Sequence, residues 1–404
     1  MRLYYKSIAL DGSAQEGISE MLDQYALARD LRARGETLVS AREVDEKSKW
    51  TLSRLNEIIV RVKLKDKMIF ASNLSAMLKA GLPLSRSLTV LEKQTRNLRL
   101  KRIIREVGSA VNGGKTLHDA LAEYARVFPP VMVAMVHAGE ESGNLPQALQ
   151  MVGSQMEKTY SMRRKVRGAL MYPALVITAM IVIGVLMMIY VVPTLAATFA
   201  EFGKDLPKMT QLVLTVSNFL IDHTNLFIAI VILTVIFFWR FAKLKIGRMV
   251  IHFVILKIPI LGTLTKEVNA ALATRTLSSL LSSGVDMVRA IEIARDVVSN
   301  VYYKDVLGTA MGEIVKGKSL ASIFTGADKL FPPLVGEMAQ VGEETGKLTE
   351  MLLNVANFYE EEVDAATKNL STTIEPLLML FIGVAVGFFA IAMIQPIYSL
   401  TMGV

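Results

Sequence analysis

The sequence contains no cysteine among its 404 residues, and it has only four histidines. Without cysteine the chain has no disulfide framework, no cysteine-bound zinc or iron–sulfur cluster and no thiol nucleophile. The histidines stand in separate segments and show no metal-ligand spacing such as H-E-x-x-H. Hydrophobic residues make up 52% of the chain, and the mean hydropathy is +0.40. The absences exclude redox and cysteine–metal chemistry, and the composition indicates a membrane protein.

Charged residues are also missing from long stretches of the chain. Residues 168–200 and 376–404 carry none, and residues 226–239 form a shorter apolar run. A bilayer core is crossed by about 20 apolar helical residues. We therefore predict three transmembrane segments, at residues 169–193, 218–241 and 372–396. The second must borrow polar neighbours around Asp222 to reach this length, and residues 194–217 and 397–404 then form an external loop and an external tail.

The distribution of basic residues predicts the orientation of these spans. Lysine and arginine number 28 up to Arg167, two between the first and second spans, fifteen from Arg240 to Lys368, and none afterwards. Positive residues mark the cytoplasmic side of a membrane. We expect a multi-pass membrane protein with a cytoplasmic N-terminus and with Val404 on the external side. The formal net charge of +8 is concentrated before the first span, where 28 basic and 18 acidic residues leave an excess of ten.

The chain contains an internal duplication. A shift of 203 residues aligns residues 70–201 with 273–404 without a gap and gives 28 identities in 132 pairs. Shared residues fall in clusters: Gly114-Lys115 with Gly317-Lys318, Phe128-Pro129-Pro130 with Phe331-Pro332-Pro333, Gly139-Glu140-Glu141 with Gly342-Glu343-Glu344, Gly143 with Gly346, Pro173 with Pro376, and Pro193 with Pro396. Each repeat is a hydrophilic domain followed by one span, both in the same orientation, so a linking span must return the chain to the cytoplasm.

Apolar residues in both hydrophilic domains recur at intervals of three and four, which is typical of helices. We predict an all-α polytopic membrane protein with two six-helix cytoplasmic bundles, at residues 66–168 and 242–371. A small α+β module is predicted at residues 1–45, with a tight turn at Asp11-Gly12. Residues 46–65 form a basic amphipathic linker helix, which either packs its apolar stripe on the adjacent bundle or binds anionic lipid or an acidic partner.

One motif imitates a nucleotide-binding site. Residues Gly312 to Ser319 fit the phosphate-loop pattern G-x-x-x-x-G-K-S. That loop must leave a strand and present turn amides before a helix, whereas the residues between these glycines continue a helical pattern. The duplicate, Ser109 to Thr116, keeps Gly-Lys-Thr but lacks the first glycine. We interpret the motif as the end of one helix and the cap of the next.

The paired glutamates are the most distinctive polar feature, and each pair lies between two glycines at a turn between helices. The first interpretation is structural: a glutamate reaches the free amides at the next helix start, and glycine permits the turn. A divalent-ion or partner-binding acidic edge is the alternative, with Glu140, Glu141, Glu343 and Glu344 as the candidate ligands. A catalytic carboxylate pair is disfavoured, and we expect no enzyme activity and no cofactor. Another acidic run, Glu360 to Asp364, predicts a solvated face of the last helix.

Taken together, the repeats, the spans and these motifs resemble the inner-membrane platform proteins of type IV pilus assembly and type II secretion. The similarity covers the whole chain, and it rests on both F-P-P and both G-E-E-x-G clusters, on Tyr172-Pro173 and Val192-Pro193 around the first span, and on Gln395-Pro396 at the end of the third. One departure is Glu375-Pro376 in place of a second Tyr-Pro. The residues that this pattern marks as structural or partner-contact candidates are Gly139, Glu140, Glu141, Gly143, Gly342, Glu343, Glu344, Gly346, Pro129, Pro130, Pro332, Pro333, Pro173, Pro193, Pro376 and Pro396.

The resemblance implies a non-enzymatic role in the bacterial inner membrane, with the C-terminus on the periplasmic side. Such proteins couple a cytoplasmic hexameric ATPase to the insertion of pilin or pseudopilin into a filament. Expected partners are that ATPase, the pilin, other inner-membrane assembly components, further copies of the chain and the lipid bilayer, but not nucleic acid. A transporter or channel subunit with parallel repeats is the alternative. The first span and the apolar core of the third carry no ionisable side chain of the kind that ion and proton pathways use, which disfavours it.

Overall fold

The computed structural model describes residues 2–9, 14–20, 24–33, 35–43, 60–194, 197 and 208–401. It divides into two compact units, one formed by residues 1–63 with 92–105 and the other by residues 64–91 with 106–404. The predicted turn at Asp11-Gly12 and most of the predicted linker helix 46–65 lie outside the described residues. The described residues are mostly helical, which agrees with the periodicity of the sequence.

The first unit contains a three-stranded antiparallel sheet with the strand order β2-β1-β3. Its elements are β1 (Arg2–Ala9), β2 (Ala14–Glu20), α1 (Gln24–Ala33) and β3 (Glu36–Glu43). Leu27 and Leu31 form the apolar face of α1, and both are buried. The Ser7 hydroxyl donates a hydrogen bond to the Glu36 carboxylate, which links the first strand to the third.

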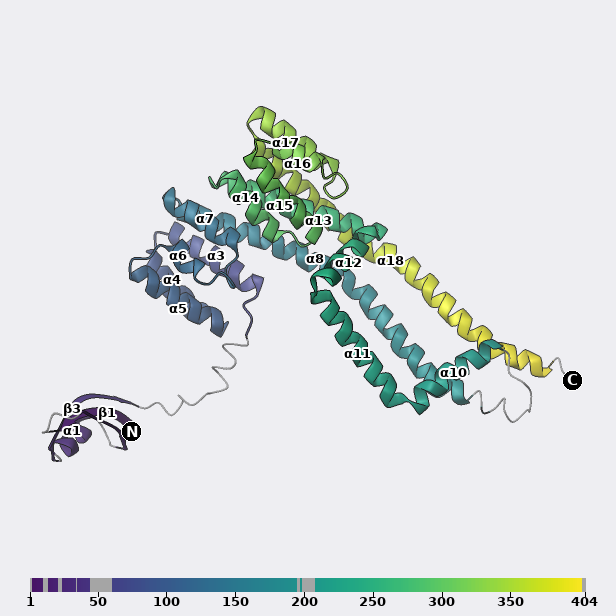
Figure 1. The fold of residues 1–404 in the computed structure, drawn as a ribbon, viewed down its shortest axis with the longest axis horizontal. Coiled ribbons are helices and arrows are strands. Elements are labelled where there is room, and N and C mark those ends of the chain that lie inside the picture. The colour runs from purple at the N-terminus through teal and green to yellow at the C-terminus, as the bar shows by residue number, and fades with distance from the viewer. Residues whose placement is uncertain are drawn as a thin grey trace. The chain divides into compact units, whose positions relative to one another are not determined.

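The first repeat contains six described helices, labelled in Figure 1. They are α3 (Leu64–Lys79), α4 (Leu84–Gln94), α5 (Leu98–Asn112), α6 (Leu117–Ala122), α7 (Pro130–Glu141) and α8 (Leu145–Leu186). Pro130 occupies the first position of α7, where a missing amide hydrogen leaves no bond unmade. The rings of Phe70 and Phe128 lie 5.5 Å apart and join α3 to the segment before α7.

The second repeat contains six helices in the corresponding order. They are α13 (Pro259–Ser282), α14 (Met287–Val297), α15 (Val301–Val315), α16 (Leu320–Thr325), α17 (Pro333–Thr345) and α18 (Leu348–Thr401). Its core contains three aromatic rings in edge-to-face contact, in which the Phe331 ring centre lies 4.9 Å from that of Tyr303 and 4.8 Å from that of Phe324. Phe331 is the counterpart of Phe128, and both side chains are fully buried. The duplicated F-P-P cluster therefore supplies one core aromatic and one helix start to each bundle.

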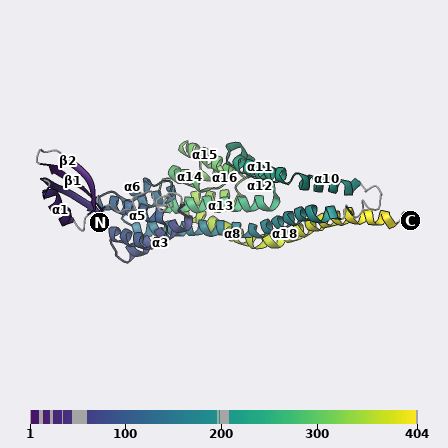
Figure 2. The ribbon, with the colours of Figure 1, turned by 90° about the horizontal axis from the view of Figure 1, so that it is seen from below.

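Two of the helices that are long and apolar enough to cross a membrane are the last helices of the two repeats, α8 and α18. Both continue away from the bundles in the same direction (Figures 1 and 2). At the end of α8 the residues Met187–Val191 form a π-helical turn, η2, in which the Val192 amide donates to the Met187 carbonyl. The next residue, Pro193, lacks an amide hydrogen and its ring crowds the preceding turn, and a π-turn absorbs such a misfit.

The third candidate span is α11 (Thr224–Lys243), which returns towards the bundles (Figure 1). The predicted start of this span at residue 218 is wrong, because residues Lys208–Asp222 form a separate helix, α10, and His223 has non-helical backbone angles. Part of the predicted external loop is therefore helical. Val213 of α10 packs on Val192, with Phe389 of α18 beside them, so α10 packs at the end of α8 and against the side of α18.

The third predicted span does not end as a helix at Pro396. Helix α18 passes through Pro376 and Pro396 and continues to Thr401. Proline is tolerated inside membrane helices because neighbouring groups satisfy the freed carbonyl. The predicted tail 397–404 is accordingly helical for most of its length.

Between α11 and the second bundle lies α12 (Lys245–Lys257), which bends by 109° into α13. Together α12 and α13 are apolar enough to form one broken span, which would bring the number of candidate spans in the described residues to four. However, α13 buries much of its surface, including Ala270, Leu272 and Leu277, inside the second bundle. A helix whose apolar residues are already covered by protein does not need lipid, so we count three spans.

Candidate functional site

Each G-E-E-x-G turn joins two helices that cross at very short range. A methyl group added to Gly139 would lie 2.4 Å from the Cβ of Ala148, and one added to Gly342 would lie 2.7 Å from the Cα of Leu348. Only a glycine allows the incoming helix to approach this closely. The closing glycines, Gly143 and Gly346, adopt φ of 68° and 70°, the left-handed region that favours glycine. The two glycines of each motif thus have different structural roles.

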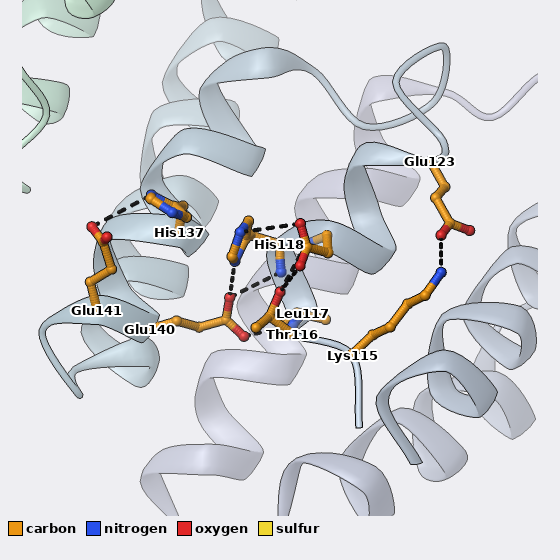
Figure 3. A network of polar contacts seen from close by, with 9 residues as sticks. Lys115, Thr116, Leu117, His118, Glu123, His137, Glu140 and Glu141 are labelled. Atoms are coloured by element: carbon orange, nitrogen blue, oxygen red, sulfur yellow. Dashed lines mark hydrogen bonds and ion pairs between the residues drawn. The ribbon is translucent and has the colours of Figure 1, made fainter. Parts of the chain in front are cut away.

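The first glutamate of each motif caps a helix. Both carboxylate oxygens of Glu140 accept amide hydrogen bonds at the start of α6, at 2.6 Å from Leu117 and 3.0 Å from His118 (Figure 3). Glu343 does the same at the start of α16, with 2.7 Å to the Leu320 amide and 3.3 Å to the Ala321 amide. The capped helix is the preceding short helix and not the next one, so that detail of the expectation was wrong. A carboxylate at a helix N-terminus satisfies otherwise unpaired amides and interacts favourably with the helix dipole.

The second glutamate of each motif lies at the surface. Glu141 is 69% exposed and lies 3.5 Å from the Nδ1 atom of His137 (Figure 3). Glu344 is exposed and accepts a hydrogen bond from the Gln340 side chain at 2.9 Å. Within the described residues, no group of three or more histidine, aspartate or glutamate side chains is arranged to hold a metal ion. In each motif, therefore, one carboxylate is hydrogen-bonded to backbone amides and the other is accessible to a partner.

A histidine pair distinguishes the first turn from the second. The rings of His118 and His137 meet edge to face at 4.2 Å, and the Nδ1 atom of His118 lies 2.6 Å from Glu140 (Figure 3). The equivalent residues in the second repeat are Ala321 and Gln340. This pair cannot be found from residue spacing, because the two histidines lie on different helices and follow no spacing rule. Only the comparison of the two repeats reveals that the first turn differs.

The residues of the phosphate-loop imitation form a turn between two helices. Helix α15 ends at Val315, Gly317 has φ of +86°, and Ser319 caps α16 by accepting a hydrogen bond from the Ser322 amide. In the first repeat Thr116 caps α6 by accepting from the Asp119 amide. The interpretation of this motif as a helix end and a cap is confirmed.

The two repeats meet along α8, α13 and α18. At the centre of this contact the buried Gln155 side chain donates to the Thr276 hydroxyl at 3.0 Å and accepts from Ser279 at 3.4 Å. A buried amide that is bonded to the other repeat fixes the relative position of the helices, because an unpaired polar group there is costly. We call the contact formed by Gln155, Thr276 and the ion pairs described next the inter-repeat junction.

Ion pairs extend this junction, and they correct one expectation. Glu360 is 12% exposed and binds Arg275 at 2.8 Å and Lys158 of the first repeat at 3.2 Å. Asp364 binds Lys165 of the first repeat at 2.7 Å and Lys368 at 3.1 Å. The Lys165 ammonium, followed by Lys368, lowers the pKa of Asp364. The acidic run Glu360 to Asp364 is thus not simply a solvated face, since two of its members hold the repeats together.

The candidate prolines occupy helix starts and helix interiors. Pro129 and Pro332 precede α7 and α17, whose first residues are Pro130 and Pro333. Pro173 is buried within α8. A contact between the candidate residues and a partner stays a prediction.

Comparisons with known proteins agree with this architecture. The family model for the type II secretion system protein F matches residues 70–193 and 273–396, which are related by the same shift of 203 residues as the duplication. The type IV pilus assembly protein PilC of Thermus thermophilus is 34% identical over 98% of this chain and 97% of its own length. PilC of Myxococcus xanthus is 33% identical, with coverage of 96% and 92%. The type II secretion system protein F of Xanthomonas campestris is 30% identical over 99% of each chain. The chain belongs to the type II secretion system protein F family.

Proposed function

We propose that this protein is the inner-membrane platform of a type IV pilus or type II secretion machine. In this role it couples a cytoplasmic hexameric ATPase to the insertion of pilin or pseudopilin into a filament. The N-terminal module and both bundles face the cytoplasm, and the C-terminus lies on the periplasmic side. The distribution of lysine and arginine supports this orientation, and the names of the relatives support the assembly role.

One observation carries the mechanical part of the proposal. In each repeat the helix that closes the bundle is the same helix that enters the membrane: α8 begins at Leu145 and continues to Leu186, and α18 begins at Leu348 and continues to Thr401. No loop separates the bundle from the span. A displacement of the bundle surface by an ATPase is therefore transmitted along a continuous helix into the bilayer.

The inter-repeat junction links the two transmitting helices. Gln155 of α8 bonds to Thr276 of the second repeat, and Lys165 of α8 binds Asp364 of α18. Since both contacts lie on the bundle side of the spans, a force applied to one bundle also reaches the span of the other. The two spans then move as a pair.

The chemistry of the spans favours a protein partner in the membrane over a solute path. Residues 169–193 carry no ionisable group of the kind that ion and proton pathways use. Large apolar side chains on both spans are exposed in the chain alone, among them Leu175, Ile181, Leu380 and Val384. Such a surface is suited to lipid and to the apolar helix of a pilin, which would meet it laterally.

The rigid-helix mechanism can be tested with two matched double variants. Arg163 and Arg164 are exposed on α8 between the bundle and the span. Arg163→Gly with Arg164→Gly removes two charges and softens the helix by about 1 kcal/mol per residue, whereas the corresponding alanine variant removes the same charges and keeps the helix stiff. In a strain lacking the native gene, we expect several-fold fewer filaments with the glycine variant and near-normal numbers with the alanine variant, at equal membrane levels. Equal filament numbers would contradict transmission through α8.

The partners can be tested separately by photo-crosslinking in cells. A crosslinking residue at the exposed Arg126 or Lys329 on the bundles is expected to capture the ATPase. A crosslinking residue at Leu175 or Leu380 on the spans is expected to capture pilin. If the bundle positions capture no ATPase and the span positions no pilin, the platform function is wrong.

A further inference from the structure

Helix α12 is held at a fixed angle at both of its ends. A single residue, Leu244, separates it from the span α11. A methyl group on Gly247 would lie 1.9 Å from the Phe241 carbonyl oxygen, and one on Gly262 would lie 2.4 Å from the Leu256 carbonyl oxygen. Both turns therefore bring backbone against backbone at a distance that a larger residue prevents. The two glycines thus fix α12 as a bent connection between the second span and the second bundle, and we call α12 with its two turns the elbow.

The charged residues along the segment that forms this elbow all have one sign. From His223 to Lys266 the chain contains no aspartate or glutamate, while six lysines and arginines occur there, the last four being Lys245, Arg248, Lys257 and Lys266. At the end of α11 the Lys243 ammonium lies 3.3 Å from the centre of the Trp239 ring. Tryptophan and lysine at the end of a span are typical of the boundary between hydrocarbon and headgroups. Helix α12 therefore begins at that boundary.

The two faces of α12 have different neighbours. One side is tied to the start of α15: the Val301 amide donates to Nδ1 of His252 at 3.0 Å, and the Tyr302 hydroxyl donates to the Met249 carbonyl at 3.4 Å. Burial, and then the nearby Arg248, lower the pKa of His252, which favours the neutral ring that accepts this bond. Another side carries an exposed apolar ridge, formed by Ile246, Met249, Val250, Phe253 and Val254.

A hollow of about 420 Å³ lies along the ridge, lined by Ile246, Met249, Val250, Phe253 and Tyr302. Its lining is almost entirely apolar, and no charged side chain contributes to it. Since α12 has 13 residues, it is about 20 Å long, which is too short to cross a hydrocarbon core of about 30 Å. Its sharp bend into a protein-covered helix also prevents it from continuing a span. The ridge and the hollow therefore lie at the membrane boundary, and none of the residues that the structure describes covers them.

We propose that α12 is an interfacial helix, whose apolar ridge lies among the acyl chains of the cytoplasmic leaflet and whose basic residues bind anionic phospholipid headgroups. The occupant of the hollow is an acyl chain. An amphipathic helix with an apolar face and lysine or arginine on its flanks binds a lipid surface in this way. The elbow then fixes the second bundle at a defined height and angle against the membrane. This inference does not depend on the identity of the ATPase or the filament.

The absence of cysteine makes the first test direct, because a single cysteine can be introduced without removing others. We would place a nitroxide label on Val250→Cys and Phe253→Cys in the full chain, reconstituted in nanodiscs that contain phosphatidylglycerol. Leu233→Cys, 64% exposed on α11, is the lipid control, and Val315→Cys, 73% exposed on the second bundle, is the water control. Collision with oxygen reports lipid, and collision with a water-soluble nickel chelate reports solvent.

We expect Val250→Cys and Phe253→Cys to collide with oxygen in preference to nickel, as Leu233→Cys does, and Val315→Cys to show the reverse. Nickel accessibility at both α12 positions equal to that of Val315→Cys would overturn the proposal. Protection from both reagents would overturn it as well, because protein would then cover the ridge. In that case, dipolar broadening that falls when labelled chains are diluted with unlabelled ones would identify a second copy as the covering protein. Agreement between the two labelled positions guards against a local folding defect.

The headgroup contact has its own test. Lys245→Gln with Arg248→Gln removes two charges from α12, and Lys316→Gln with Lys347→Gln removes two from exposed positions of the second bundle. Native mass spectrometry would measure how much phosphatidylglycerol each full-length variant retains in competition with phosphatidylcholine. A basic residue near an anionic surface contributes about fivefold, so we expect the α12 variant to lose at least about tenfold in preference for phosphatidylglycerol and the control to keep it. An equal loss in both variants, or none in either, would overturn the headgroup contact.

Discussion

The glutamate caps give the sharpest test of how the duplicated turn stabilises each bundle. Glu140→Ala removes the acceptor of two consecutive amides at the start of α6, those of Leu117 and His118. Thr116 satisfies the amide of the next residue, Asp119. The change therefore leaves Thr116 as the cap of a six-residue helix and removes the acceptor of the two amides before Asp119. The matched control is Glu141→Ala, because Glu141 is largely exposed and touches only His137 among the described contacts.

The size of the effect follows from these contacts. A buried amide that loses its partner costs about 1–3 kcal/mol, and loss of a helix cap costs about 0.5–2 kcal/mol. The Glu140 side chain is 20% exposed, so water can reach part of the vacated space and the lower end of the range applies to each amide. We expect a total of about 2 kcal/mol in the free energy of local opening of α6, which is about 30-fold in the opening equilibrium.

Hydrogen exchange measured by mass spectrometry on the full chain in detergent micelles reports this opening directly. A peptide that covers residues 117–122 is expected to exchange about 30-fold faster in Glu140→Ala than in the native protein. Peptides from α18 serve as an internal reference, since the change does not touch that helix. Native-like exchange in Glu140→Ala would contradict a capping role for Glu140, and so would an equal acceleration of exchange in Glu141→Ala.

Two further predictions concern the second repeat. Gly342→Ala places a methyl group against the backbone of Leu348, which should destabilise the protein by about 1–3 kcal/mol and lower its melting temperature in detergent. The control is Gly312→Ala, where nothing lies within 4 Å of the added methyl group, and its melting temperature should not fall. Equal melting temperatures of the two variants would contradict the close approach of helices at Gly342. The Glu267 Oε2 atom is buried and has no hydrogen-bond partner among the residues that the structure describes, and burial followed by Glu362 raises the pKa of this carboxyl. Because the folded-state pKa of Glu267 lies above its unfolded value, the stability of the native protein falls as the pH rises through the folded-state pKa. Glu267→Gln should therefore have a higher melting temperature than the native protein at about pH 8, and this difference should disappear towards about pH 4. A difference in melting temperature that does not change with pH would show that ionisation of Glu267 is not involved.

Much of the architecture could be predicted because the sequence contains the same pattern of bundle and span twice. The family resemblance and the two repeats are confirmed, and the matched segments have the predicted offset. Helical periodicity and the absence of charge are local properties, so the mostly helical fold and the existence of three candidate spans could be read from the sequence. The division of α10 from α11 could not, because hydropathy alone does not reveal that His223 leaves the helical conformation.

The site was less predictable because its contacts are distant in the sequence. Glu140 caps an amide 23 residues earlier, while the sequence pattern pointed only to its immediate neighbours. The acidic run predicts a solvated face for Glu360, yet this residue is covered because Lys158 of the other repeat and Arg275 lie against it. The packing of one repeat on the other depends on the three-dimensional arrangement, and residue spacing within one repeat carries no information about it.

The ion pairs of Asp364 have a consequence for the history of the two halves. Lys165 and Lys368 occupy the same position in their repeats, and Asp364 binds both, whereas its counterpart in the first repeat is Ser161. A chain assembled from two first halves would bring two lysines together with no acid between them. The first half therefore lacks the acid that this contact needs, so a second copy of it would not rebuild the ion pairs that Asp364 makes across the junction.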